Sequence, residues 1–410
     1  MLKKTFIAWM AILITIGCLV SIPTFSNGNE ITTLRVLLYP FVPNRLALFQ
    51  TIEASFERDN PGVNLELVDD RDLLSTYYTG GLLKASADVY EVDTIMLADL
   101  ANSSKIVPLD LPSVDFYKEA IKAVTRNNSI YAVPHWVCGN FLFFKKGDKE
   151  IEDAESWTEL LRIIKNRNQS LFIDLKGKST LGEWYLTVLS EIDGLEAAQK
   201  SILESDAPRP SVVSLLTTVL DVCPDGFCRN RDLHDRTGYY ARAFISGKSI
   251  AYIGYSESIS YGIQYSLDNC TSTSGCLSIN DIAVKRLPYF VENPKNKGIG
   301  WVDGLAIDSK LNGHKKELAI KLINYLVSEE AYTSILKPEW MQAPPYLMPA
   351  RVSLNIKGAP LYHSFYNAFY GRETGTMVGL NDRLIRIGTN LNCALPIGRT
   401  DNESQNECHK

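Results

Sequence analysis

The order of the apolar segments along the chain restricts its fold more than any other feature. The segment "LRVLLY" at 34–39 is typical of a short buried strand, and apolar residues then recur at helical spacing from Leu46 to Phe56. A second strand segment, "VNLELV", follows at 63–68, and the strand-like "ADVYEVD" at 87–93 precedes another helical pattern. Strands that alternate with helices build parallel sheets covered by helices. The sequence therefore predicts an α/β fold.

The chain is long enough for more than one such unit. Its 410 residues predict roughly two or three domains, each able to bury its own core. Hydrophobic residues make up 45% and charged residues 22% of the sequence, which is ordinary for a folded globular protein. This composition excludes a collagen-like, coiled-coil or disordered chain.

The first 26 residues have a different character. Lys3 and Lys4 precede the apolar run "FIAWMAILITIGCLVSIP", and "TFS" at 24–26 supplies small residues at a cleavage point. We therefore expect a secretory signal peptide at 1–26 and a secreted or periplasmic mature protein without membrane association. The alternative is an uncleaved anchor helix, although the run is barely long enough to span a bilayer. Cleavage removes two lysines and no acids, which takes the net charge from −5 to −7.

The cysteines matter because thiols outside the cytosol tend to pair. Of eight cysteines, loss of Cys18 with the signal peptide leaves seven. Three pairs bracket short segments rich in turn residues and predict three local disulfides: Cys223 with Cys228, Cys270 with Cys276, and Cys393 with Cys408. Cys138 is then unpaired. An unpaired cysteine in an exported protein is a buried inert thiol, a partner for another chain, or a reactive nucleophile.

Export also gives meaning to the Asn-x-Ser/Thr sequons. In a host that glycosylates secreted proteins they predict a glycoprotein, and the sequence leaves the host undecided. The five acceptors are Asn102, Asn127, Asn168, Asn269 and Asn402.

Several familiar sites are excluded by spacing. The five histidines are scattered without metal-ligand spacing, so we expect no metal site and no cofactor. "GKS" at 247–249 lacks the upstream glycine of a phosphate-binding loop, and "GYSES" at 254–258 lacks the final glycine of a serine-hydrolase elbow. The acidic chain has no basic cluster, which argues against a nucleic-acid partner.

The surroundings of Cys138, in "PHWVCGNFLFF", are more informative. In an extended segment residues two apart share a face, so Trp136, Cys138 and Asn140 point to one side and His135 to the other. A catalytic pair of Cys138 with His135 is therefore disfavoured.

The same spacing of two recurs in three other segments, which pair Tyr39 with Phe41, Tyr255 with Glu257, and Trp301 with Asp303. Asp93 stands at the carboxyl end of a predicted strand, where α/β sheets usually hold ligand groups. Aromatic walls with acids favour a flat, cationic ligand. The competing interpretation assigns the aromatic residues to the core and the acids to the surface.

Two longer segments resemble the type II periplasmic substrate-binding fold: "SIYAVPHWVCGNFLFFKKGD" with the following "ESWTELLRIIKN", and "GIGWVDGLAIDSKLNGHKKELAIKLINYL". The resemblance implies a monomer of two α/β lobes with a central cleft between them. On this basis we expect the signal peptide at 1–26, lobe I at 27–137 and 300–345, and lobe II at 138–299 and 346–410.

Six pieces, in order across most of the mature chain, resemble thiaminase I, a family of secreted enzymes on that fold: "LLYPFVPN", "FERDNPGVNLEL", "DVYEVDTIML", "YAVPHWVCGNFLFFKKGD", "AYIGYSES" and "WVDGLAIDS". The resemblance implies that Cys138 is the nucleophile and Glu257 the base that activates it. It further implies that Asp93 and Asp303 bind the pyrimidine and the leaving or entering group.

The resemblance also implies that three tyrosines line the site, namely Tyr39, Tyr239 and Tyr255. The sequence departs from the family pattern at Phe41 and Trp301, which stand where tyrosines are expected, and in its three cysteine pairs. The expected substrates are thiamine and a small nucleophile such as an amine, a thiol or water. The alternative is a non-catalytic solute-binding protein for thiamine or another cationic small molecule.

Overall fold

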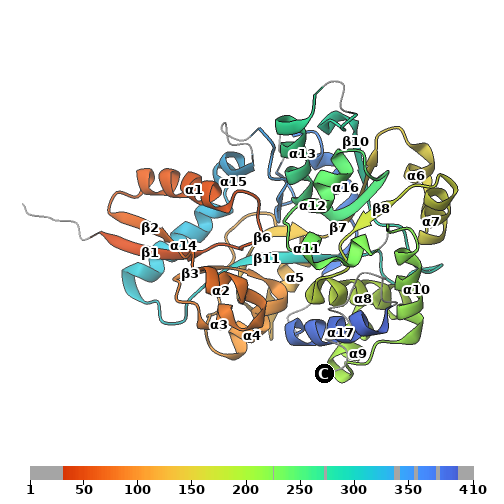
Figure 1. The fold of residues 1–410 in the computed structure, drawn as a ribbon. Coiled ribbons are helices and arrows are strands. Elements are labelled where there is room, and N and C mark those ends of the chain that lie inside the picture. Colours follow the sequence, from red (N-terminus) through yellow and green to blue (C-terminus); the bar gives the residue numbers. More distant parts are fainter. Residues whose placement is uncertain are drawn as a thin grey trace, which may run out of the picture.

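The computed structural model describes residues 31–395 except 225, 272–274, 337–341, 355–358 and 375–378. The predicted signal peptide lies outside the described residues. The described chain forms two α/β lobes, each built around its own sheet (Figure 1). The predicted α/β class is confirmed. No helix in these ranges combines the length and the apolar character needed to cross a membrane.

The first sheet has the strand order β12-β6-β11-β3-β1-β2, and β13 pairs with β11. Its strands are β1 (Thr32–Leu37), β2 (Val63–Leu67), β3 (Val89–Asp93), β6 (Val133–Cys138), β11 (Ile299–Ile307), β12 (Met348–Pro349) and β13 (Glu373–Thr374). β1 is parallel to β2 and β3, whereas β11 is antiparallel to β3 and β6. Every residue of β3 and β11 is buried, as expected for strands covered on both faces.

Helices pack on this sheet and carry most of its apolar cover. They are α1 (Arg45–Asp59), α2 (Arg71–Ser75), α3 (Gly81–Lys84), α4 (Thr94–Asn102), α5 (Lys118–Ala123), α14 (Gly313–Leu326) and α15 (Glu329–Leu336), with a 3₁₀ helix at Tyr77–Thr79 and a small hairpin of β4 (Thr125–Arg126) and β5 (Ser129–Ile130). The buried stripe of α1 consists of Leu48, Phe49, Ile52 and Phe56. Leu46 is exposed because a helix turns about 100° per residue, which places it outside that stripe.

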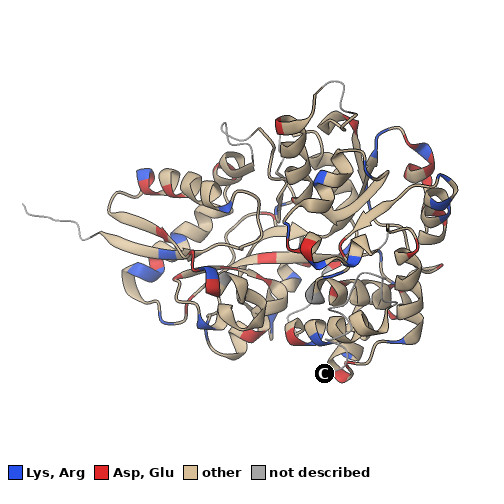
Figure 2. Cartoon of the chain, viewed as in Figure 1, with Lys and Arg blue, Asp and Glu red and all other residues tan. Residues whose placement is uncertain are grey.

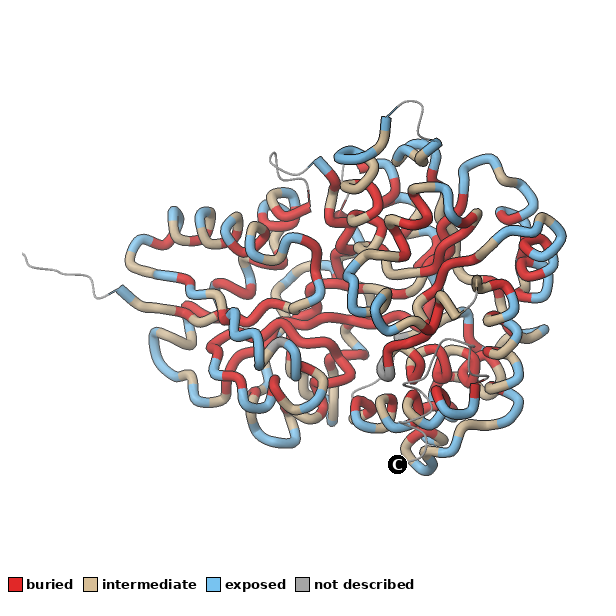
Figure 3. The backbone as a smooth tube through the Cα atoms, viewed as in Figure 1, coloured by how far each residue is buried: buried red, intermediate tan, exposed pale blue. Residues whose placement is uncertain are grey.

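The second sheet has the order β10-β7-β9-β8. Its strands are β7 (Asn140–Lys145), β8 (Leu171–Ile173), β9 (Ala251–Tyr255) and β10 (Ile282–Lys285). β9 runs parallel to β8 and antiparallel to β7. The backbone of the central strands is buried in both lobes, while the outer helices alternate between buried and exposed residues (Figure 3).

The helices around the second sheet come from two distant parts of the chain. They are α6 (Lys149–Asp153), α7 (Trp157–Asn166), α8 (Lys178–Asp193), α9 (Leu195–Glu204), α10 (Pro210–Leu220), α11 (Arg231–His234), α12 (Tyr239–Ile245), α13 (Ser258–Asn269), α16 (Tyr362–Phe369) and α17 (Asn381–Ala394), with 3₁₀ helices at Phe227–Arg229 and Ile279–Asp281. Ser156 caps α7 in a reciprocal capping box with Glu159. α17 packs along α8, so the end of the described chain belongs with this sheet (Figure 1).

The chain passes from one sheet to the other within three residues. β6 ends at Cys138, Gly139 follows, and β7 begins at Asn140. β11 later returns to the first sheet, and β12, within the range expected for lobe II, pairs with β6. The lobe boundaries themselves stay a prediction.

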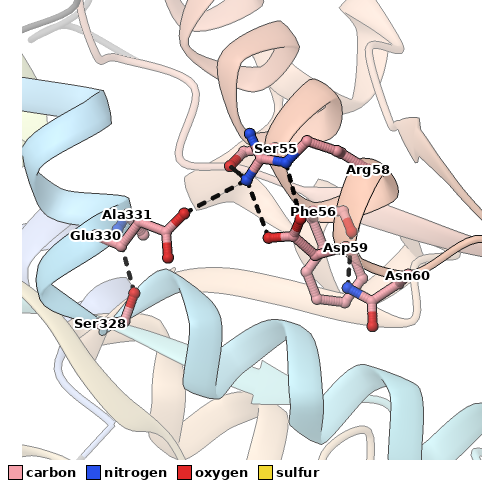
Figure 4. Close-up of polar contacts among 8 residues, drawn as sticks. All are labelled: Ser55, Phe56, Arg58, Asp59, Asn60, Ser328, Glu330 and Ala331. Carbon is pink, nitrogen blue, oxygen red and sulfur yellow. Dashed lines mark hydrogen bonds and ion pairs between the residues drawn. The ribbon is translucent and has the colours of Figure 1, made fainter.

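Ion pairs join the elements mainly at the periphery, where Lys and Arg lie on the outer helices (Figure 2). At the end of α1 the Arg58 guanidinium contacts Asp59 at 2.8 Å and Glu330 of α15 at 3.5 Å (Figure 4). These side chains are more than half exposed. Such contacts align the two helices but stabilise the fold little.

Two of the three predicted disulfides are present, Cys223 with Cys228 and Cys270 with Cys276. Cys393 is also disulfide-bonded, and its expected partner Cys408 lies outside the described residues. Four of the sequon acceptors, Asn102, Asn127, Asn168 and Asn269, are exposed, and Asn402 lies outside the described residues.

Candidate active site

A cavity of about 500 Å³ is lined by residues of both sheets. The structure brings together on its wall all nine residues that the sequence singles out as a site, which are Tyr39, Phe41, Asp93, Cys138, Tyr239, Tyr255, Glu257, Trp301 and Asp303. They come from six separate stretches of the sequence, and it is the fold that brings them together. The volume is in the range of small-molecule sites.

Cys138 is placed at the crossing between the sheets, opposite Trp301 of β11. Among the described residues it is the free cysteine, and its side chain is half-buried. Burial raises the pKa of the Cys138 thiol well above its usual range, and the charges of Asp303 and Glu257 raise it further. The thiol is therefore protonated at neutral pH, so nucleophilic attack requires a base.

Because Gly139 has no side chain, the buried guanidinium of Arg372 can pack against the crossing. A Cβ on Gly139 would overlap Nη1 of Arg372, whose Nη2 donates to the Asn140 carbonyl at 2.8 Å. Arg372 also donates to carbonyls of Ile299 and Ala368, at 3.5 and 3.3 Å, and is only 6% exposed. Burial lowers the pKa of Arg372 to about 10, while the neighbouring Cys138 raises it. Arg372 thus fixes the backbone on which Cys138 is presented.

Asp93 and Asp303 form a carboxylate pair on neighbouring strands. They are direct partners in the β3–β11 ladder and are 8% and 5% exposed. Asp93 caps α4 by accepting from the Ile95 amide at 3.0 Å, and it accepts from the Tyr78 hydroxyl at 3.0 Å. Burial raises the pKa of both carboxyls, and the charge of Asp93 raises that of Asp303 further. Within the described residues neither forms an ion pair.

An aromatic cluster extends from this pair. The Tyr39 and Tyr78 hydroxyls are 2.7 Å apart, and Phe41 stacks on Tyr78 with ring centroids 6.0 Å apart and an interplanar angle of 5°. Tyr39 packs edge-on against Phe41. Flat apolar faces beside two carboxylates suit an aromatic cation.

Glu257 also lines the cavity, at the N-cap of α13 and two residues after Tyr255. Tyr255 in turn pairs with Asn140, next to the crossing. The Ser256 hydroxyl donates to Glu257 at 3.2 Å. Burial raises the pKa of Glu257 to about 7, where a carboxyl group acts well as a general base at neutral pH.

Comparisons with known proteins identify what the whole chain is similar to. No protein-family model matches the chain. Thiaminase-1 of Paenibacillus thiaminolyticus is 27% identical over 346 residues, which are 80% of this chain and 78% of that protein. The chain is a homologue of thiaminase I.

Solved thiaminase I structures share the fold. Thiaminase I from Bacillus thiaminolyticus superposes with a TM-score of 0.71 and 21% identity, covering 89% of this chain and 100% of that one. Clostridium botulinum thiaminase I in complex with thiamin gives 0.69 and 21%, covering 87% and 98%. A maltose-bound T. maritima protein gives 0.64 and 16%, covering 88% and 99%. The fold is therefore the type II periplasmic-binding-protein-like fold, as predicted.

Sequence reasoning missed a fourth acid of this thiaminase I homologue. Glu183 of α8 lines the cavity and accepts a hydrogen bond from the Tyr255 hydroxyl. Burial raises the pKa of Glu183 to about 8. The available signal was a single acid inside the apolar run "LGEWYLTVL" at 181–189.

Sequence reasoning also missed Asp174 and His234, which line the same cavity and contact each other. His135, by contrast, is kept from the cavity, as predicted: it is 1% exposed, and its Nδ1 lies 2.6 Å from Glu91. Among the described residues no group of three potential metal-binding side chains is present.

Proposed function

We propose that the protein is a secreted thiaminase I-type transferase, which cleaves thiamine and passes its pyrimidine to a second nucleophile. The single observation that carries the proposal is the placement of an unpaired cysteine, Cys138, on one cavity wall with the carboxyl of Glu257. A protein that only holds its ligand needs neither group. The sequence similarity to thiaminase-1 supports the same activity.

In the first half of the reaction Cys138 attacks the pyrimidine ring. Glu257 takes the thiol proton as the bond forms between sulfur and the ring carbon beside the one that bears the methylene group. The electron pair gained by the ring then expels the thiazole from the methylene carbon. The C–N bonding pair goes to the thiazole nitrogen, so a cation leaves as a neutral molecule.

In the second half an amine, a thiol or water adds to the methylene carbon. The S–C bond to Cys138 breaks, and the thiolate recovers its proton from Glu257. One difficult substitution thereby becomes two easier ones.

The acids and aromatic residues of the cavity hold the substrate in this scheme. Asp93 and Asp303 bind the pyrimidine and the departing or entering group, and the positive thiazolium offsets their buried charge. The flat faces of Tyr39, Phe41 and Trp301 stack on the rings. Tyr255 and Tyr239 also line the cavity.

The test is incubation of the purified mature protein with thiamine and pyridine, followed by chromatography of the small molecules. We expect release of free thiazole and formation of a pyridinium product, both lost in Cys138→Ser. Tight binding of unchanged thiamine by the wild-type protein would instead identify a solute-binding protein.

A further inference from the structure

Asp174 and His234 form a second acid–base pair on the cavity wall. Asp174 directly follows β8, whose last residue Ile173 pairs with Ile253 of β9. His234 is the last residue of α11, and its Nδ1 lies 2.7 Å from Oδ2 of Asp174. The pair comes from segments 60 residues apart. Neither residue takes part in the steps assigned to Cys138 and Glu257.

The geometry fixes which nitrogen of His234 is available. A carboxylate at Nδ1 accepts the proton there, which leaves Nε2 with its lone pair. Among the described residues Nε2 has no hydrogen-bond partner, and the side chain is 34% exposed on the cavity wall. The hydrogen bond to Asp174 raises the pKa of His234 above its usual value. This is how a carboxylate orients a histidine that acts as a general base.

The protein makes room for this imidazole. A Cβ on Gly177 would lie 2.7 Å from Cε1 of His234, although the backbone there suits any residue. Asn230 caps α11 by accepting from the Leu233 amide at 3.1 Å. The charged groups beside the ring, Arg231 and Asp235, pair with each other at 3.6 Å. The imidazole is therefore held in place, and neither charged neighbour pairs with its Nε2.

Asp174 and His234 lie close enough to Cys138 for one bound substrate to contact all three residues. β8 and β7 flank β9, and Asn140 of β7 adjoins the crossing at Cys138. Two strand spacings amount to roughly 10 Å, so Asp174 stands about that far from the strand that begins at Asn140. Cys138, Asp174 and His234 line the same cavity, so a substrate held at Cys138 shares that space with the imidazole.

The second half of the reaction leaves one proton without an acceptor. Glu257 already carries the proton of Cys138 and returns it to the departing thiolate. Resting on the proposed function, we propose that His234 is the base that removes the proton of the second nucleophile, so that the co-substrate is a protic molecule such as a thiol or an amine. As the new bond forms at the methylene carbon, the proton passes to Nε2 and the S–C bond pair returns to Cys138. Solvent then takes the proton from His234.

The test is a competition in one tube between pyridine, which has no transferable proton, and 2-mercaptoethanol. Both nucleophiles react with the same enzyme-bound pyrimidine, so the product ratio does not depend on how much of a variant is folded. General-base catalysis contributes at least about 100-fold. We therefore expect His234→Gln to shift the ratio about 100-fold toward the pyridinium product.

Three further variants sharpen the result. Asp174→Asn disorients the imidazole and shifts the ratio in the same direction by about 10-fold, since second-layer partners contribute 10–100-fold. Gly177→Ala displaces the His234 ring and should shift the product ratio in the same direction. His314→Gln, at an exposed histidine that pairs weakly with Glu317 at 3.7 Å, leaves the ratio unchanged. The intact mass of the protein after the assay verifies that 2-mercaptoethanol has not reduced the disulfides.

An unchanged product ratio in His234→Gln, with both rates reduced together, overturns the inference. The pair would then be a structural contact between α11 and the residue that follows β8. If the wild-type protein forms neither product, the proposed function itself fails, which is a different result from an unchanged ratio.

Discussion

The carboxylates at the outer end of α1 and those in the cavity differ in burial and in ion pairing. At α1 the acids Asp59 and Glu330 are more than half exposed and share the Arg58 guanidinium (Figure 4). In the cavity Asp93 and Asp303 are almost fully buried and, within the described residues, have no ion-pair partner. Burying a charge without a partner is costly. In the proposed function a cationic substrate and a proton transfer use these acids, which accounts for the cost in the cavity.

The largest effect expected from this comparison is at Glu257. Glu257→Gln removes the base and lowers the rate of thiazole release by roughly 10²–10⁴-fold. Because burial raises the pKa of Glu257 to about 7, we expect wild-type activity at low thiamine to rise with pH as Glu257 loses its proton. The Glu257→Gln variant should lack this pH dependence. Stopped-flow or quenched assays between pH 5 and 8 measure both. A full-rate Glu257→Gln enzyme would assign the base elsewhere.

Gly139→Ala tests whether the crossing must be kept clear for Arg372. The new methyl group overlaps the guanidinium, so we expect a loss of about 1–3 kcal/mol in the free energy of unfolding and at least a 10-fold lower rate. Gly147→Ala is a control for backbone strain alone, because Gly147 has a positive φ (87°), which Gly139 lacks, and its Cβ would meet no atom within 4 Å. A Gly139→Ala enzyme with the wild-type rate and stability would mean that the crossing need not be kept clear for Arg372.

Asp303→Asn removes one buried charge and keeps the shape of the site. We expect thiamine affinity to fall about 10–100-fold, in line with the 1.5–3 kcal/mol of a hydrogen bond to a charged group. The ligand-free protein should at the same time become more stable, because the repulsion from Asp93 is relieved. Calorimetry of binding and thermal unfolding separate the two effects. Loss of both affinity and stability would make Asp303 a structural residue.

The pH dependence of stability tests the cavity acids together. Burial raises the pKa of Glu183 to about 8 and of Glu257 to about 7 from an ordinary 4.5, so the folded protein holds these protons more tightly than the unfolded chain. Their contribution is fully present below pH 4.5 and is lost as the pH rises to 7–8. We expect the melting temperature of the ligand-free protein to fall between pH 5 and 8. Glu183→Gln should reduce that fall, and an unaltered slope would contradict the assignment.

The smallest effect is expected at the outer end of α1. Glu330→Ala removes an exposed carboxylate that lies 3.5 Å from Arg58 and is not among the cavity-lining residues. Because exposed pairs contribute little, activity should be unchanged and the melting temperature should stay within measurement error. A clear loss of activity in Glu330→Ala would contradict the distinction between the exposed acids at α1 and the buried acids of the cavity.

Much of the cavity could be predicted from the sequence because local periodicity determines which side chains share a face. Alternation in β6 separates Cys138 from His135, and the strand end at Asp93 directs its carboxyl to the ligand edge. The same reasoning failed for Leu46, whose spacing fits the helix but lies outside the buried stripe. Periodicity identifies faces well and the edges of a face poorly.

The remaining site residues depend on long-range packing. Glu183 faces the cavity because α8 is pressed against α17, whose residues follow about 200 positions later. His234 needs Asp174, which follows β8 and lies 60 residues earlier, and Arg372 reaches a carbonyl 232 residues away. No local pattern encodes such partners. The glycines that admit them, Gly139 and Gly177, acquire their meaning only from the folded neighbours.

The most direct test of the account is to locate the pyrimidine on the protein during turnover. Wild-type protein is mixed with thiamine without an added nucleophile, quenched in acid within milliseconds to seconds, digested and analysed by mass spectrometry. The account predicts the added mass of the aminopyrimidinyl methylene group on the peptide that contains Cys138, at a higher level in His234→Gln. Consumption of thiamine with the added mass on another residue, or with none on Cys138 at any time, would contradict it.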